Sequence, residues 1–128
     1  MKKIAFVCIH NSCRSQMAEA IAKEYLKEKD VEIYSAGTQE YPEIKPMVIE
    51  TLEKVNIKVN NQYPKLLADI PKDIDILITM GCGVECPYVP AKSIEDWGLD
   101  DPSGKGIEAF DITRDLIIKK VKHLKTKI

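Results

Sequence analysis

One stretch near the N-terminus decides the fold: Lys2–Ser15, with the sequence KKIAFVCIHNSCRS. Its first part, Lys2–Val7, is short and mostly apolar, which is typical of a buried strand. Apolar residues then recur at helical spacing from Ser15 to Lys29, so a helix follows the strand almost at once. The apolar positions of this helix are Met17, Ala18, Ile21, Ala22, Tyr25 and Leu26. A strand, a short loop and a helix in this order are the unit from which parallel sheets are built.

Strands and helices also alternate along the rest of the chain. Further strands are expected over Val31–Ser35, Ile74–Thr79 and Ser93–Asp96. Helices are expected over Met47–Val55, after Pro46, and over Ile107–Ile128, with a single helical turn over Lys65–Ala68. We therefore predict one α/β domain over residues 1–128, a three-layer sandwich with a four-stranded parallel sheet in the order 2-1-3-4 and helices on both faces. In such sheets, ligands bind outside the carboxyl ends of the strands.

Composition excludes several classes of protein. With 128 residues, 45% of them hydrophobic and 30% charged, the chain has the makings of one compact domain with a buried core. Its 19 basic and 20 acidic residues give a net charge of −1, which argues against a nucleic-acid surface. No apolar run approaches the roughly 20 residues that cross a bilayer, and the first residues lack the features of a signal peptide. We expect a cytoplasmic monomer that binds neither nucleic acid nor membrane.

The loop between the first strand and the first helix is suited to bind an oxyanion. It consists of Ile9, His10, Asn11, Ser12, Cys13 and Arg14. Backbone N–H groups at a helix N-terminus attract anions, and the Arg14 guanidinium offers a two-pronged donor. The same field favours the thiolate form of Cys8, to whose sulfur Ser15 can donate its hydroxyl. The alternative is that Cys8 is a buried apolar residue at the end of a strand and Arg14 a surface charge.

The motif Cys8-x5-Arg14-Ser15 followed by a helix resembles the signature of the low-molecular-weight tyrosine phosphatase superfamily. Three further segments make the chain similar to the thioredoxin-coupled arsenate reductase branch of that superfamily. They are NSCRSQMAE at Asn11–Glu19, YSAG at Tyr34–Gly37 and WGLDDP at Trp97–Pro102. The segments occur in family order, so the resemblance covers essentially the whole chain. It implies a reaction in which Cys8 attacks a bound oxyanion.

Asp101, directly before Pro102, is the candidate general acid. A bond from Cys8 to an oxyanion expels an oxygen group, which must be protonated as it leaves. The resemblance implies that Asp101 supplies this proton, whereas on spacing alone Asp100 and Asp101 could equally form a solvated turn before the last helix. Phosphatases of the superfamily carry aromatic residues after this position, but here the sequence is SGKG. These residues are small, flexible and cationic, which favours a small inorganic anion over a phosphotyrosine ring.

Cys82 and Cys86 follow the third expected strand, in the sequence MGCGVECP. The glycines and the proline predict a segment that changes shape, and in a helix the two cysteines would lie about 6 Å apart on one face, near the outer limit for a disulfide. Reducing arsenate to arsenite takes two electrons, which two sulfurs supply by forming a disulfide. The resemblance implies a cascade from Cys8 to Cys82 to Cys86, followed by exchange with thioredoxin or a similar dithiol.

Other readings of the cysteines stay open. Cys82 and Cys86 could be inert, or could bind zinc with another cysteine or a histidine, although a second short ligand pair is missing. In phosphatase relatives, a loop cysteine matching Cys13 bridges to the nucleophile, so redox sensing is a further possibility. We expect no metal and no cofactor.

Some members of the family bind potassium through residues that match Asn11, Glu19 and Ser35, together with an acid. This chain has Lys65 where that acid is expected, which argues against a potassium site. We therefore expect Asn11 and Ser35 to fix the shape of the loop through hydrogen bonds.

Three functions compete on this evidence. The first is an arsenate reductase that uses Cys8, Cys82 and Cys86, with phosphate and sulfate as competing anions. The second is a phosphatase of phosphotyrosine or small phosphate esters that uses Cys8, Arg14 and Asp101. The third is a non-enzymatic oxyanion-binding or redox-sensing module. The second thiol pair and the missing aromatic wall favour the first function, and Asp101 argues against the third.

Overall fold

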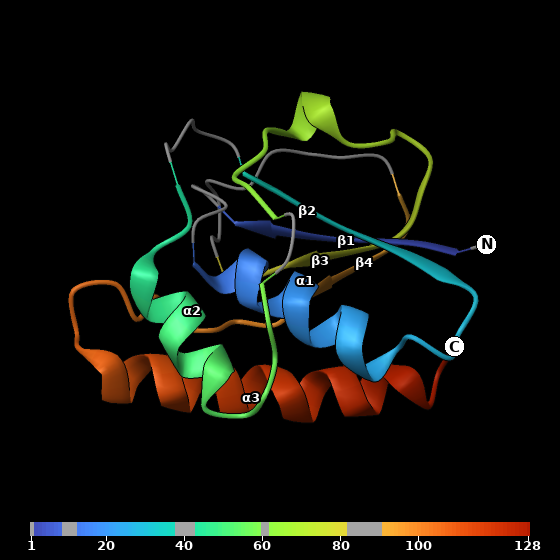
Figure 1. Ribbon diagram of the computed structural model, residues 1–128. Coiled ribbons are helices and arrows are strands. Elements are labelled where there is room, and N and C mark those ends of the chain that lie inside the picture. The colour runs from blue at the N-terminus through green and yellow to red at the C-terminus, as the bar shows by residue number, and fades with distance from the viewer. Residues whose placement is uncertain (1, 9–12, 38–42, 60–61, 82–90) are drawn as a thin grey trace.

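The computed structural model describes residues 2–8, 13–37, 43–59, 62–81 and 91–128. Its four strands are β1 (Lys2–Cys8), β2 (Val31–Gly37), β3 (Ile74–Thr79) and β4 (Ala91–Asp96). All neighbouring strands are parallel, and their order in the sheet is β2-β1-β3-β4 (Figure 1). The predicted sheet and its strand order are confirmed.

The central strand β1 is buried on both faces from Ile4 onward. Ile4 and Phe6 belong to the larger hydrophobic core, while Ala5 and Val7 belong to a smaller core on the opposite face. Because both faces of a parallel sheet are covered, such a strand needs an uninterrupted apolar run rather than alternating polarity. This explains why the segment could be recognised as a strand from its sequence.

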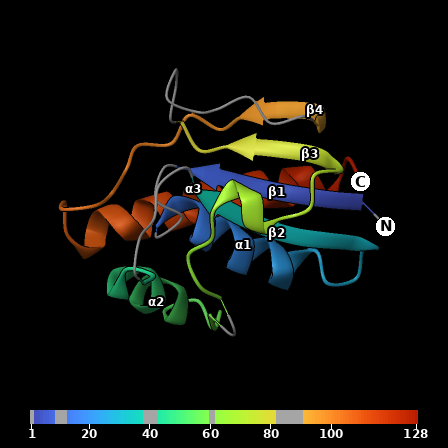
Figure 2. The same ribbon diagram turned by 90° about the horizontal axis from the view of Figure 1, so that it is seen from above.

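The three α-helices of the described residues are α1 (Arg14–Tyr25), α2 (Pro46–Glu53) and α3 (Ile107–Lys125). Helices α1 and α3 pack side by side against the larger core, and α2 packs mainly on α3 (Figures 1 and 2). The opposite face is covered by the segment around the 3₁₀ helix η1 (Leu67–Asp69), where Leu67 and Ile70 pack with Ala5 and Val7. In the described part of the chain, the short 3₁₀ helix η1 is therefore the one helical element on that second face.

Element boundaries differ from the prediction by a few residues. Helix α1 ends at Tyr25 instead of Lys29, because the chain turns through hydrogen bonds from Lys29 N–H to Leu26 and from Val31 N–H to Lys29 before it enters β2. Strand β4 begins two residues earlier than expected, and α3 ends at Lys125. In the described part of the chain, no helix is both long and apolar enough to cross a membrane.

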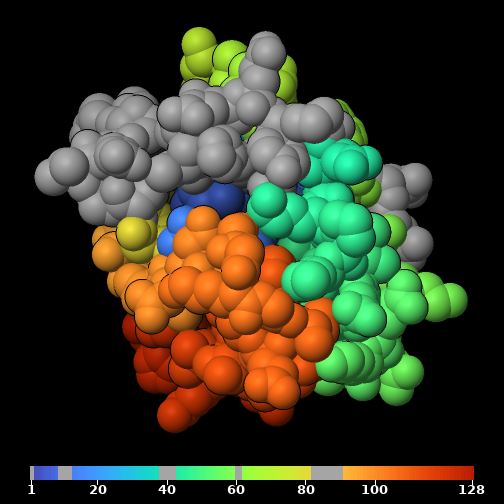
Figure 3. Space-filling view, turned by 90° about the vertical axis from the view of Figure 1, so that its left-hand side faces the viewer, coloured from blue at the N-terminus to red at the C-terminus, as the bar shows by residue number. Residues whose placement is uncertain are grey.

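The carboxyl ends of β1, β3 and β4 meet at one edge of the sheet. Val7 pairs with Thr79, and Thr79 pairs with Asp96. Two hydrogen bonds extend the ladder past the strand ends, from Met80 N–H to Val7 at 3.1 Å and from Trp97 N–H to Thr79 at 2.9 Å. Figure 3 looks onto this edge, and blue atoms of the N-terminal part are visible there between the orange segment after β4 and the green segment around α2.

Candidate active site

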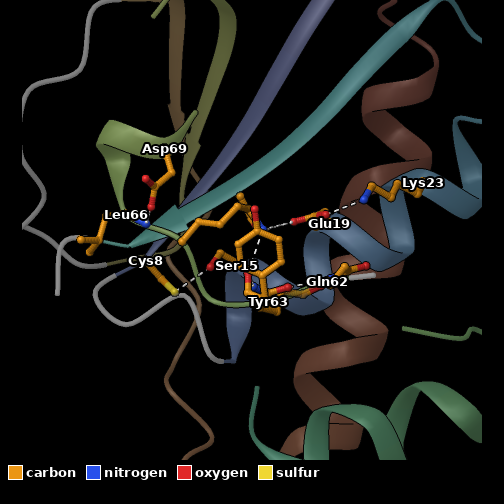
Figure 4. A network of polar contacts seen from close by, with 11 residues as sticks. Cys8, Ser15, Glu19, Lys23, Gln62, Tyr63, Leu66 and Asp69 are labelled. Carbon is orange, nitrogen blue, oxygen red and sulfur yellow. Dashed lines mark hydrogen bonds and ion pairs between the residues drawn. The ribbon is translucent and has the colours of Figure 1, made fainter. Parts of the chain in front are cut away.

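Cys8 and Ser15 form the centre of the candidate site. Cys8 is the last residue of β1 and Ser15 lies in the first turn of α1, so the short connection between the two elements brings them together. The Cys8 Sγ lies 2.8 Å from the Ser15 Oγ, and both residues are buried (Figure 4). The contact predicted between this hydroxyl and the sulfur is present. The Ser15 hydroxyl, in the first turn of α1, is therefore within hydrogen-bond distance of the candidate nucleophile.

Arg14 is buried, with 7% of its surface exposed. Its Nη1 atom donates to two backbone carbonyls, of Met80 at 2.6 Å and of Leu99 at 2.7 Å. Met80 follows β3 and Leu99 follows β4, so the guanidinium joins the oxyanion-binding loop to the segments that lead to Cys82 and Asp101. The alternative in which Arg14 is a surface charge is wrong.

Asp101 lies at the same edge, in the turn between β4 and α3. Its Oδ1 atom accepts a hydrogen bond from the Ser103 backbone N–H at 3.0 Å. Partial burial acts to raise the pKa of the Asp101 carboxyl, but hydrogen bonds from the Ser103 backbone and hydroxyl, together with the charges of Arg14 and Lys45, lower the pKa below its usual value. The carboxyl is therefore ionised near neutral pH in the free protein.

Cys13 precedes the first residue of α1 and is 5% exposed. Burial, together with the negative charge of Asp101 and the neighbouring Cys8, raises the pKa of the Cys13 thiol to about 12. A hydrogen bond with the Ser103 side chain and the charge of Arg14 act in the opposite direction without outweighing them. Cys13 therefore stays a neutral thiol near pH 7, beside the candidate acid.

Ser35 lies on β2, and its hydroxyl donates to the Glu19 carboxylate on α1. The predicted contact of Ser35 with the loop involves residues outside the described part of the chain and stays a prediction. Glu19 is 3% exposed and also pairs with Lys65 at 3.5 Å and with Lys23 at 2.5 Å (Figure 4). A buried carboxylate needs charged and hydrogen-bonding partners, and Ser35 is one of them.

Six predicted site residues lie outside the described part of the chain. They are Ile9, His10, Asn11, Ser12, Cys82 and Cys86. Gly81, directly before Cys82, has a φ of +95° and lies against the backbone of Leu99, where an added Cβ would be 2.9 Å from the carbonyl oxygen. The residue directly before Cys82 is thus packed against the segment that leads to Asp101.

Several residues of the site carry no clear signal in the sequence. The fold alone shows that Ser103 and Lys45 lie near Asp101 and that Glu19 is buried. The spacing of Glu19 and Lys23 is typical of a helical ion pair, but it does not reveal the contacts with Ser35 and Lys65. Within the described residues, no group of three or more His, Cys, Asp or Glu residues is arranged to hold a metal ion.

Chemically, the arrangement joins a buried nucleophile, a cation and a carboxyl group. The Cys8 sulfur can attack the central atom of a tetrahedral oxyanion, and Arg14 lies where it can neutralise negative charge. A carboxyl group at the same edge can move a proton to or from the leaving oxygen. These are the elements of covalent catalysis on phosphate or on an anion of the same shape.

Comparison with known proteins agrees with this reading. Residues 3–128 match the family "Low molecular weight phosphotyrosine protein phosphatase". The glutaredoxin arsenate reductase of Synechocystis sp. is 38% identical over 132 residues, which cover 100% of this chain and 99% of that protein.

Two solved structures are also similar. An arsenate reductase in the phosphate binding state superposes with a TM-score of 0.90 at 37% identity and covers 100% of this chain and 99% of its own. The thioredoxin-dependent arsenate reductase of Corynebacterium glutamicum gives a TM-score of 0.75 at 32% identity, with 100% of this chain and 64% of that chain covered. This chain therefore belongs to the low molecular weight phosphotyrosine protein phosphatase family, among its arsenate reductase members.

Proposed function

We propose that this chain reduces arsenate to arsenite by a cascade of three cysteines that begins at Cys8. The observation that carries the proposal is the contact of 2.8 Å between the Cys8 sulfur and the Ser15 hydroxyl at the start of α1, next to the buried Arg14. Full-length similarity to arsenate reductases supports arsenate as the anion. The small residues that follow Asp101 support the same choice, because they offer no wall for an aromatic ring.

In the first step, the Cys8 thiolate attacks arsenic and forms a sulfur–arsenic bond. One oxygen of arsenate leaves as water, and its second proton comes from Asp101. Because Asp101 is ionised in the free protein, it first takes up a proton that the arsenate monoanion brings with it. Arsenic is still As(V) after this step, and no electron has been transferred.

Reduction takes place in the second step. The Cys82 thiolate attacks the Cys8 sulfur and forms a Cys8–Cys82 disulfide, while the electron pair of the broken sulfur–arsenic bond stays on arsenic. Arsenic leaves as As(III) and takes up protons to give arsenous acid. The two sulfurs together have lost two electrons, which balances the reduction.

The third step restores the nucleophile. The Cys86 thiolate attacks Cys82, which frees the Cys8 thiolate and leaves a Cys82–Cys86 disulfide. A dithiol protein then reduces this disulfide. We propose a thioredoxin-type partner, in line with the thioredoxin-dependent relative, and the glutaredoxin-named relative makes a glutaredoxin the competing partner to test.

A phosphatase is the second candidate function. It needs Cys8, Arg14 and Asp101 but neither of the other two thiols, and the family description supports it. Phosphate and arsenate have nearly the same shape, so slow hydrolysis of phosphate esters at Cys8 is compatible with the main proposal. The two functions differ in their need for Cys82.

The test is a coupled assay that follows NADPH oxidation with arsenate, thioredoxin and thioredoxin reductase, and in parallel with glutathione, glutaredoxin and glutathione reductase. We expect turnover with the thioredoxin system, loss of turnover in Cys8→Ser and Cys82→Ser, and residual phosphate-ester hydrolysis in Cys82→Ser. Ser93→Ala, a change on the edge strand β4, serves as the control. Full arsenate turnover by Cys82→Ser would rule out the cascade, and turnover with glutaredoxin alone would replace the proposed partner.

A further inference from the structure

A pocket with a volume of about 360 Å³ lies between the end of β4 and the C-terminal half of α3. Strand β4 is an outermost strand of the sheet, so the pocket lies at one side of the molecule (Figure 2). None of Cys8, Arg14 and Asp101 lines it, so it is distinct from the candidate active site. Ligand pockets commonly have volumes of about 300–1,000 Å³, and this one is therefore large enough for a small organic molecule.

The pocket has an apolar floor, formed by Trp97 and Leu124. Both side chains line the pocket, and both are buried members of the larger hydrophobic core. The Trp97 ring packs against Phe6 with a distance of 5.4 Å between the ring centroids, which holds it in place under the pocket. Leu116 on α3 lines the pocket as well, and 45% of its surface is exposed. A ligand with an apolar body would cover this leucine and the floor together.

Three lysines around the apolar floor form a lysine rim: Lys119, Lys120 and Lys127. The Lys120 Nζ lies 5.9 Å from the centroid of the Trp97 ring, so its charge stands over the floor itself. Among the described residues, none of the three lysines forms an ion pair, and Glu95 is the one acidic residue that lines the pocket. Three ammonium groups against one carboxylate give the pocket a positive potential.

We propose that this pocket binds a small organic anion with an apolar body, such as a medium-chain or aromatic carboxylate. The body lies on the apolar floor and against Leu116, while the carboxylate stays at the lysine rim. Lysine ammonium groups bind such anions as point charges with three rotatable donors, and their methylene stems extend the apolar wall. The pocket is concave and lies between two elements, which suits a single molecule better than the flat surface of a bilayer.

The first test uses intrinsic fluorescence, because Trp97 is the single tryptophan of the chain and forms part of the apolar floor. The protein is titrated with octanoate, octan-1-ol and octylamine, which have the same number of carbon atoms and differ in charge. We expect a saturable change with octanoate, binding of octan-1-ol that is about five-fold weaker, and still weaker binding of octylamine. Octan-1-ol that binds as tightly as octanoate, or octanoate that gives no saturable change, would overturn the proposal.

The second test changes exposed residues of the pocket. The double variant Lys119→Gln with Lys127→Gln should bind octanoate about five-fold more weakly while its affinity for octan-1-ol stays the same. Leu116→Asp should abolish binding of octanoate, because it places a carboxylate beside the apolar floor. Lys122→Gln is the matched control, since Lys122 lies on α3 with its Nζ 5.5 Å from the Tyr25 ring and does not line the pocket. Equal octanoate affinities of the double variant and Lys122→Gln would overturn the role of the lysine rim.

The third test separates this pocket from other places where an anion could bind. Phosphate, a ligand for the loop beside Cys8, should not displace octanoate, and displacement would place the octanoate site at that loop instead. Vesicles that contain phosphatidylserine should not bind, and binding of vesicles without binding of free octanoate would assign the lysine rim to a membrane surface. All of these measurements work without turnover. A protein that lacks arsenate reductase activity would therefore refute the proposed function and leave this proposal standing, whereas failure of octanoate to bind would refute this proposal alone.

Discussion

At the scale of single residues, the Ser15 hydroxyl carries the most specific prediction about the nucleophile. It lies 2.8 Å from the Cys8 sulfur and is fully buried, so water cannot easily replace it. A hydrogen bond to a charged group contributes about 1.5 kcal/mol or more, which corresponds to about ten-fold in a rate when the bond stabilises the reacting sulfur. We therefore expect Ser15→Ala to lower the rate at which iodoacetamide alkylates Cys8 at pH 7 by about ten-fold.

Peptide mapping by mass spectrometry identifies which cysteine reacts, and Ser93→Ala provides the matched serine-to-alanine control. An unchanged alkylation rate at Cys8 in Ser15→Ala would mean that the hydroxyl has no influence on the reactivity of the sulfur.

The contact between Cys8 and Ser15 could be predicted from the sequence, whereas the partners of Glu19 could not. Cys8, Arg14 and Ser15 stand at fixed spacing in one short segment, so their chemistry can be read locally. The partners of Glu19 could not be predicted in the same way, because Ser35 and Lys65 come from distant parts of the chain. The contact of Ser35 with Glu19 illustrates this, because a hydroxyl hydrogen-bonds a buried group that needs it, and burial is a property of the fold.

At the scale of elements, the pair of Glu19 and Lys65 fastens α1 to the segment that precedes η1. The carboxylate is almost fully buried, and the Lys65 side chain is 12% exposed. Replacing Lys65 by methionine removes one of the charges that compensate the buried carboxylate, so we expect a loss of about 1–3 kcal/mol in the free energy of unfolding. Urea denaturation followed by circular dichroism measures this loss.

Lys27→Met is the matched control. Lys27 lies just after α1, and its Nζ is 3.1 Å from the exposed carboxylate of Glu24. An exposed pair of this kind contributes at most about 1 kcal/mol. The double variant Glu19→Gln with Lys65→Met should lose less stability than the sum of the single variants, since neither charge is then left behind. Equal effects of Lys65→Met and Lys27→Met would show that the buried pair is not a structural link.

The connection between β3 and Cys82 passes through Gly81. Gly81 combines a φ of +95° with a close approach to Leu99, whereas Gly104 has a φ of +78° but open space around it. Gly104→Ala should therefore cost roughly 1–2 kcal/mol from backbone strain alone. Gly81→Ala should cost roughly 1–3 kcal/mol more, because the added methyl group also displaces the Leu99 backbone. Thermal unfolding compares the two variants, and equal losses would mean that the contact with Leu99 yields easily.

Elements were easier to predict than their ends. Strands β1 and β3 stand out as apolar runs because a parallel sheet buries both of their faces. The end of α1 was predicted four residues too late, since the turn into β2 depends on backbone hydrogen bonds that residue periodicity does not report. The start of β4 was also misplaced, because its first residues have little apolar character and β4 is an outermost strand of the sheet.

At the scale of the whole molecule, the sheet topology gathers the chemistry at one edge. All four parallel strands end there, and Arg14 donates to Met80, the first residue beyond β3, and to Leu99 in the segment beyond β4. An anion that binds to Arg14 thus contacts a side chain that is already hydrogen-bonded to Met80 and Leu99. These residues lead to Cys82 and Asp101. The proposed cascade needs this convergence, because Cys82 has to reach Cys8, which another part of the chain supplies.

The proposed order of the cascade makes a prediction for Cys86→Ser. Without the third thiol, the Cys8–Cys82 disulfide cannot be resolved, so each protein molecule should release at most one arsenite and then stop. A quenched-flow experiment with excess arsenate should show a single burst of arsenite equal to the protein concentration, with no steady-state phase. Mass spectrometry should find Cys8 and Cys82 joined in the stalled protein. Cys82→Ser, in contrast, should give no burst, because arsenic then stays on Cys8 as As(V). Repeated turnover by Cys86→Ser with thioredoxin would show that the partner attacks the first disulfide directly, and Cys86 would then have no place in the reaction.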